Sequence, residues 1–225
     1  LSYSRNDFVF ILHDDDVLYP DFVAHNVDYM SRNPSVALTS CNGTVIDDDS
    51  LVVGKLFSVV NSNYLTLSNK FDVALRYSND ACIPLSPAFY RVSVLKNVEI
   101  KCEYGQVTDA ILFFDIVDYG EIALLNQPLF FCRKHSNQDS MGLTNEVLNR
   151  QVNYFLTGLQ HEPFDLSELR FNFSVQYTYR QFLYLYRFLT FNSNMTATDF
   201  LTVMINPSFT FHAPTFIVRR SALTT

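Results

Sequence analysis

The order of apolar and polar positions in the first 50 residues predicts alternating strands and helices. The run FVFIL at residues 8–12 predicts a buried strand, and residues 36–46 predict one long strand or a pair of short ones. Between them, apolar side chains recur at helical spacing after Pro20, which suits a first helical turn, and Asn33-Pro34 ends this helix. The alternation is typical of an α/β domain.

Two more amphipathic segments and a further apolar run extend the pattern. Ser68 and Thr108 are candidate N-caps, the first for a helix carrying Phe71 and the second for an apolar helix that ends at Gly120. Residues 122–125 predict the beginning of another strand. Toward the C-terminus the apolar residues recur at helical spacing, so one amphipathic helix is expected over 147–159 and a longer one over 166–188.

Three aspartates, Asp14, Asp15 and Asp16, directly follow the first predicted strand. In an open α/β sheet the carboxyl edge of the strands is where ligands bind. Carboxylates fixed there repel one another, and Mg²⁺ or Mn²⁺ relieves the repulsion while keeping positions open for substrate phosphates. An acidic turn before the next helix explains the same residues without a ligand, so both interpretations stay open at this point.

A second triplet, Asp47-Asp48-Asp49, has a different setting. It separates two short apolar runs, as the turn of a β-hairpin does. We therefore expect a solvated turn rather than a binding site.

Asp109 stands at the start of an apolar helix. A carboxylate there accepts backbone N–H bonds and is favoured by the helix dipole, so we expect it to be ionised near neutral pH. An ionised, positioned carboxylate can act as a general base, although a purely structural helix cap would look the same in sequence.

Cationic and polar side chains gather at residues 133–140 (RKHSNQDS), after an apolar run at 128–131. Arg133 suits a diphosphate, and His135 suits a diphosphate or a metal ion. An ordinary basic loop is the alternative.

The composition favours some classes of protein and argues against others. Hydrophobic residues make up 48% of the 225 residues, which favours a folded core, and the net charge of −7 argues against a nucleic-acid binder. The four cysteines form no CxxC pair, so neither a zinc site nor a disulfide framework is expected. No apolar run reaches the roughly 18 residues of a membrane span.

Taken in order, four segments resemble the family 2 glycosyltransferases of the GT-A fold. The matching segments are FVFILHDDDVLYP at 8–20, LSPAFYR at 85–91, TDA at 108–110 and NQPLFFCRKHSNQDS at 126–140. The resemblance implies a Rossmann-like GT-A catalytic portion over residues 1–142 and an α-helical C-terminal appendage over 143–225. It also implies an N-terminally truncated domain, because the family's first strands, which build the nucleotide pocket, are expected before Leu1.

The resemblance assigns roles to individual residues. In that family a DxD-like motif binds Mn²⁺ or Mg²⁺ with the diphosphate of a sugar nucleotide, and a downstream acid is the catalytic base. The implied base is Asp109, although position 108 is Thr where the family often has Glu. The implied donor-site residues are Asp14, Asp15, Asp16, Arg133 and His135, with Asp14, Asp16 and His135 as contacts of the metal.

The resemblance further implies transfer of a sugar with inversion, from a nucleoside diphosphate sugar to a hydroxyl of a glycan or lipid-linked acceptor, in cell-surface polysaccharide or glycan synthesis. The chain has no tryptophan and so lacks the QxxRW signature of processive synthases, which favours transfer of a single sugar. The expected location is cytoplasmic, with peripheral association at the inner face of the membrane left open.

Two other classes stay open from the sequence. A metal-dependent phosphotransferase or nucleotidyltransferase would use the acidic triplet equally well, although a two-metal site calls for more carboxylates. A non-catalytic carbohydrate-binding relic is the other alternative, but such a module has no need of a base at Asp109.

Overall fold

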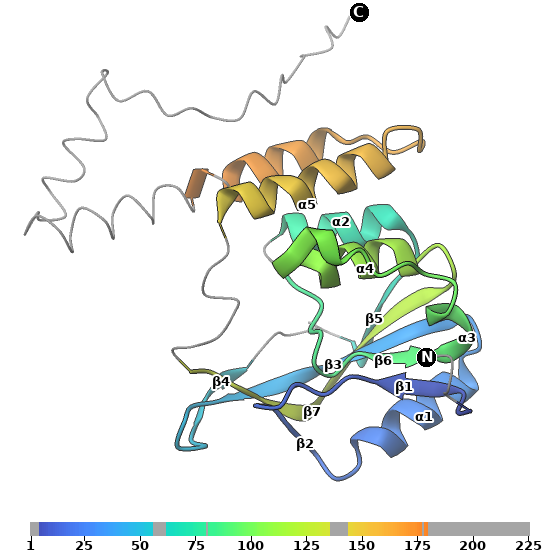
Figure 1. The fold of residues 1–225 in the computed structure, drawn as a ribbon, viewed down its shortest axis with the longest axis vertical. Coiled ribbons are helices and arrows are strands. Elements are labelled where there is room, and N and C mark those ends of the chain that lie inside the picture. Colours follow the sequence, from blue (N-terminus) through green and yellow to red (C-terminus); the bar gives the residue numbers. More distant parts are fainter. Residues whose placement is uncertain (1–4, 56–61, 80, 136–143, 177, 180–225) are drawn as a thin grey trace, which may run out of the picture. The chain divides into compact units, whose positions relative to one another are not determined.

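Two parallel strands, β3 (Val36–Ile46) and β7 (Glu121–Arg133), form the centre of a mixed sheet (Figure 1). The computed structural model describes residues 5–55, 62–79, 81–135, 144–176 and 178–179. Within these residues the sheet has seven strands in the order β1-β6-β3-β7-β2, with β4 also paired to β3 and β5 to β7. The other strands are β1 (Phe8–Phe10), β2 (Val17–Leu18), β4 (Val52–Lys55), β5 (Tyr64–Leu67) and β6 (Phe89–Arg91).

The pairing of β3 with β7 is interrupted in the middle. The register jumps from Cys41 opposite Leu125 to Asn42 opposite Pro128, because Pro128 has no N–H to donate to the ladder. A Cβ at Gly43 would lie 2.4 Å from the ring of Phe130, so only glycine fits the close approach beyond this bulge. The bulge separates the half of β7 that pairs with β5 from the half that pairs with β2.

Helices cover both faces of the sheet. Figure 1 shows α1 on one face and α2 and α4 on the other, where α4 lies between the sheet and α5. Side chains all round α4 are buried, and Phe114 stacks on Phe155 of α5 with ring centroids 4.6 Å apart. The helices are α1 (Phe22–Arg32), α2 (Lys70–Ser78), α3 (Val92–Leu95), the 3-10 helix η1 (Cys102–Val107), α4 (Thr108–Ile116) and α5 (Asn145–Gly158).

The structure confirms the α/β fold class and most of the expected elements, and it corrects their ends. The apolar run at 8–12 is a strand only to Phe10, and the side chains of Ile11 and Leu12 are 55% and 42% exposed. The strand expected to begin at 122–125 starts at Glu121 and runs through Pro128 to Arg133. The acidic segment at 47–49 is a hairpin turn between β3 and β4, as expected.

Both expected N-caps are wrong. Ahead of α2 the side chain of Asn69, rather than that of Ser68, accepts a hydrogen bond from the backbone N–H of Asp72. Thr108 is the first residue of α4, and its hydroxyl donates to the backbone carbonyl of Lys101. At α2 the side chain of Asn69 caps the helix in place of Ser68, and at α4 the carbonyl of Lys101 binds the hydroxyl of Thr108.

Two compact units divide the chain, one of residues 1–77 with 81–162 and the other of 78–80 with 163–225. The first unit contains the sheet and α5, which spans the helix expected at 147–159. In the second unit residues 167–176 are helical, whereas Tyr177 and residues 180–188 of the expected second helix lie outside the described residues. The expected boundary at residue 142 falls within residues 136–143, which are also outside the description.

Candidate metal and donor site

The acidic triplet forms a tight turn between two strands. β1 is packed through Phe10, whose ring stacks on Phe89 at 5.9 Å, and β2 pairs with the end of β7. Within the turn the backbone N–H of Asp16 donates to the carbonyl of His13 over 3.4 Å. Because both ends of the turn are anchored in the sheet, its side chains are held by rigid elements.

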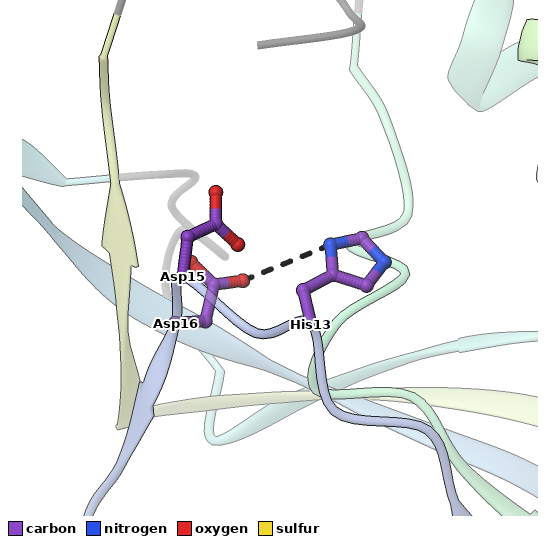
Figure 2. Close-up of side chains that lie close together, drawn as sticks. All are labelled: His13, Asp15 and Asp16. Carbon is purple, nitrogen blue, oxygen red and sulfur yellow. Dashed lines mark ion pairs between the residues drawn. The ribbon is translucent and has the colours of Figure 1, made fainter. Parts of the chain in front are cut away.

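Three of these side chains converge (Figure 2). One ligand atom from each of His13, Asp15 and Asp16 lies within 4.8 Å of the others. His13 Nδ1 is 3.9 Å from Asp16 Oδ2, and the side chain of Asp16 is 4% exposed against 46% for His13. The cluster therefore combines one buried carboxylate, that of Asp16, with the solvent-exposed imidazole of His13.

The donor chemistry of the cluster fits a divalent cation. Carboxylate oxygens suit both Mg²⁺ and Mn²⁺, but an imidazole nitrogen is a poor ligand for Mg²⁺. Among the described residues three donors converge, which leaves coordination positions for water or phosphate. The residues present fit Mn²⁺ better than Mg²⁺.

The expected metal set, Asp14, Asp16 and His135, overlaps this cluster in Asp16 alone. Asp14 is exposed at the tip of the turn and lies outside the converging group. His135 Nε2 is 3.0 Å from Asp15 Oδ2, so His135 contacts the cluster through Asp15. The structure thus brings three of these predicted residues together, Asp15, Asp16 and His135, and it adds His13.

Arg133 is bound to the turn rather than projecting into open space. Its backbone N–H donates to Asp16 Oδ1 over 2.9 Å, and its Nε donates to the carbonyl of Asp15 over 3.2 Å. Its Nη1 donates to the carbonyl of Asp47 over 2.8 Å and to the hydroxyl of Ser50 over 3.1 Å. The guanidinium therefore lies between the two acidic turns.

Asp109 lies in the first turn of α4 and is partly buried. Burial raises the pKa of its carboxyl, while backbone N–H groups of Ala110 and Asp109 and the charge of His13 act in the opposite direction. The helix-start position was expected to favour the ionised form, but desolvation outweighs it. A raised pKa makes the carboxylate a stronger base, and the effect of His13 places Asp109 within electrostatic range of the cluster.

Two tyrosines with buried hydroxyls also lie near Asp109. Burial, and then the negative charge of Asp109, raises the pKa values of Tyr77 and Tyr90. Tyr90 is on β6 and 1% exposed, and its hydroxyl has no hydrogen-bond partner among the described residues. Asp109 is therefore desolvated and shares its surroundings with two tyrosines whose hydroxyls are buried.

Sequence reasoning missed His13 and the tyrosines. The signal for His13 was its position directly before the triplet, since imidazole and carboxylate are common partners around a cation. Tyr77 and Tyr90 come from segments distant in sequence and carry no local signal. Ser50 was also missed, because its contact with Arg133 depends on tertiary structure.

Comparison with solved structures shows that this α/β domain has the fold of GT-A glycosyltransferases. Two solved structures of Staphylococcus aureus TarS, residues 1–349, share the fold with a TM-score of 0.51, one in complex with UDP and one with UDP-GlcNAc. Their sequences are 12% and 10% identical to this chain over 88% and 92% of its length. The chain spans 53% and 54% of the two TarS chains.

The two sequence comparisons find no match. No protein-family model matches the chain, and no curated protein matches it. In the described part of the chain, no helix has the length and apolar character needed to cross a membrane.

Proposed function

We propose that this chain is the catalytic portion of a Mn²⁺-dependent glycosyltransferase that moves a single sugar from a nucleoside diphosphate sugar to an acceptor hydroxyl. The observation that carries the proposal is the convergence of His13, Asp15 and Asp16 on a GT-A-like sheet, within electrostatic range of Asp109. The TarS structures with the same fold hold UDP and UDP-GlcNAc, so a uridine nucleotide is the first donor to test.

The proposed donor contacts belong to the acidic turn and the end of β7. His13, Asp15 and Asp16 would hold the cation, which supplies positive charge against the diphosphate of the donor. Asp14 is exposed at the same turn and His135 contacts Asp15, so both are proposed to contact the diphosphate or its water shell.

Asp109 is the proposed general base. Its carboxylate would take the proton of the acceptor hydroxyl while that oxygen attacks the anomeric carbon of the donor sugar. The bond from the anomeric carbon to the diphosphate oxygen breaks in the same step, and the sugar is transferred with inversion. The desolvated surroundings of Asp109 support this role, because a carboxyl with a raised pKa removes a hydroxyl proton more readily. A glycan or lipid-linked acceptor and a cytoplasmic site remain part of the proposal.

The test is calorimetric titration with UDP in Mn²⁺ and in EDTA, followed by turnover of UDP-sugars in Mn²⁺. We expect UDP binding that requires Mn²⁺ and falls in an Asp16→Asn variant, but not in Asp28→Asn, a matched change on the surface of α1. UDP binding that is equal in EDTA would contradict the metal assignment. Consumption of nucleoside triphosphates but not of UDP-sugars would instead favour a nucleotidyltransferase or phosphotransferase.

A further inference from the structure

Arg133 connects two turns that each carry three aspartates. On one side its Nε donates to the carbonyl of Asp15 in the turn of the candidate metal site, where its backbone N–H, which any residue at this position keeps, also donates to Asp16 Oδ1. On the other side its Nη1 binds the hairpin turn between β3 and β4, through the carbonyl of Asp47 and the hydroxyl of Ser50. A planar guanidinium with donors in a fixed fork suits such a bridge, whereas a lysine ammonium cannot reach both turns in one geometry.

The hairpin turn is shaped for this contact. The N–H of Ser50 donates to the carbonyl of Asp47 over 3.0 Å, and the N–H of Leu51 donates to Asp47 Oδ1 over 2.8 Å. Ser50 has φ +63°, and among the described residues it is the only non-glycine residue with a positive φ. Glycine would relieve this backbone strain, but it has no hydroxyl to accept from Arg133.

The position of Arg133 in the sheet makes the bridge rigid. It is the last residue of β7, paired with Ile46 of β3 at the start of the same hairpin, and the N–H of Lys134 continues the ladder to the carbonyl of Ile46 over 2.8 Å. One short segment thus fixes both the buried carboxylate of the cluster and the turn on the opposite side of the guanidinium.

We propose that Arg133 is a positioning residue that fixes the acidic turn of the donor site against the Asp47–Ser50 turn, so that the β3–β4 hairpin sets the geometry of the metal ligands. This inference rests on the proposed function for its consequence in metal binding. It replaces the expectation that Arg133 serves as a positive charge for the diphosphate. The two roles differ in what a lysine can do, because a point charge would satisfy a diphosphate but not the bridge.

The first test compares Arg133→Lys with Arg133→Met in calorimetric titrations with UDP and Mn²⁺. For a positioning residue both variants should weaken Mn²⁺-dependent UDP binding alike, by about 10–100-fold, as losses of outer-shell partners do. Arg32→Lys, an exposed residue on α1, is the matched control and should bind as the wild type does. Near wild-type binding by Arg133→Lys, with loss only in Arg133→Met, would overturn the proposal in favour of a diphosphate contact.

A second test does not depend on ligand binding. Hydrogen exchange of the unliganded protein should be faster in Arg133→Lys for peptides covering both residues 11–19 and residues 45–54. If wild type failed to bind UDP but both peptides responded together, the proposed function would fail and the bridge would stand. If wild type bound UDP and either peptide were unaffected by the substitution, the bridge would be wrong.

Ser50→Gly separates positioning from stability. Glycine relieves the positive φ, so the Tm should be equal or higher, while the lost hydroxyl contact should weaken Mn²⁺-dependent UDP binding severalfold. Asp49→Ala is the control in the same turn, because it keeps the carbonyl and the hydroxyl that Arg133 uses. Unchanged UDP affinity in Ser50→Gly would count against a role for the hairpin.

Discussion

The backbone N–H of Arg133 donates to Oδ1 of Asp16 over 2.9 Å, so the end of β7 holds a carboxylate 117 residues earlier in the chain. The other oxygen of the same carboxylate, Oδ2, faces His13. One oxygen of Asp16, Oδ1, thus has a structural role, and the other, Oδ2, is a candidate metal ligand. Substitutions can separate these two roles.

Asp16→Asn keeps an oxygen that can accept from Arg133, but it removes the negative charge. We expect this variant to keep its Tm close to wild type and to lose most of its Mn²⁺-dependent UDP binding. Asp16→Ala should lose both, with a drop in stability of about 1–3 kcal/mol because the backbone N–H of Arg133 is left without its acceptor. Denaturant unfolding and titration with UDP and Mn²⁺ measure the two effects, and equal metal binding by Asp16→Asn and wild type would contradict the assignment.

In His13→Ala, the affinity for UDP in the presence of Mn²⁺ should fall on the order of tenfold or more, since losing a direct metal ligand should cost at least as much as losing an outer-shell partner. Mg²⁺ should lose less affinity than Mn²⁺, because imidazole nitrogen contributes little to Mg²⁺ binding. His25→Ala is a matched control on the exposed face of α1, where His25 pairs with Asp21. An equal loss for both metals would show that His13 acts through folding or charge rather than as a ligand.

Asp109→Asn should leave UDP and Mn²⁺ affinity nearly unchanged and lower turnover by about 10²–10⁴-fold, the usual effect of removing a general base. In the wild type, turnover should fall on the acid side with an apparent pKa above the ordinary value of 3.8, because burial raises the pKa of Asp109. Rate measurements against pH with a UDP-sugar check both points. Transfer by Asp109→Asn at close to the wild-type rate would exclude the role.

The same carboxyl should weaken the fold at neutral pH. A raised pKa means that the folded protein binds the proton more tightly than the unfolded chain does, so the penalty is absent below pH 3.8 and grows as pH rises through the folded pKa. Asp109→Asn removes this penalty, and we expect its Tm at pH 7 to equal or exceed that of wild type. The difference should vanish in thermal melts near pH 3.8, and a lower Tm at pH 7 would mean that the backbone bonds of Asp109 outweigh its desolvation.

Two tyrosine hydroxyls should respond in opposite directions to the same substitution. The buried hydroxyl of Tyr90 has no partner among the described residues, so Tyr90→Phe should be neutral or stabilise by about 1 kcal/mol. The hydroxyl of Tyr154 donates to Asp115 over 2.7 Å and accepts from Lys101, also over 2.7 Å, so Tyr154→Phe should destabilise by about 1 kcal/mol. Urea unfolding of the pair measures both, and destabilisation by Tyr90→Phe would reveal a bond made by that hydroxyl.

The fold could be predicted where local periodicity decides it. Residues 36–46 and 147–159 have patterns that the final packing preserves, and the hairpin turn at 47–49 follows from three aspartates between apolar runs. The length of β7 could not be predicted, because Pro128 argues for a strand end and only the bulge opposite Asn42 accommodates it. The sequence pattern therefore defined the elements better than their ends.

The candidate site was predictable in position but not in its internal roles. The acidic triplet follows an apolar run, which predicted where a candidate site would lie, yet sequence alone does not show which carboxylates converge. Asp15 and Asp16, but not Asp14, converge with His13, and this choice depends on the conformation of a turn that the strands on both sides anchor. Arg133 looked like a phosphate ligand because its partners, backbone carbonyls and a serine hydroxyl, have no sequence signature.

The central position of β7, and its contact with the acidic turn, have a practical consequence for identifying the donor. The strand pairs with β3, β5 and β2, and its last residues hold the acidic turn, so opening the site means breaking the ladders at the centre of the sheet. The donor site and the sheet should therefore unfold as one cooperative unit, and a ligand should protect that whole unit. A nucleotide at 100 times its Kd adds about 2.7 kcal/mol to the stability of the folded state. Melting a panel of nucleoside diphosphates and their sugars with Mn²⁺ should consequently rank donors directly, before any acceptor is known.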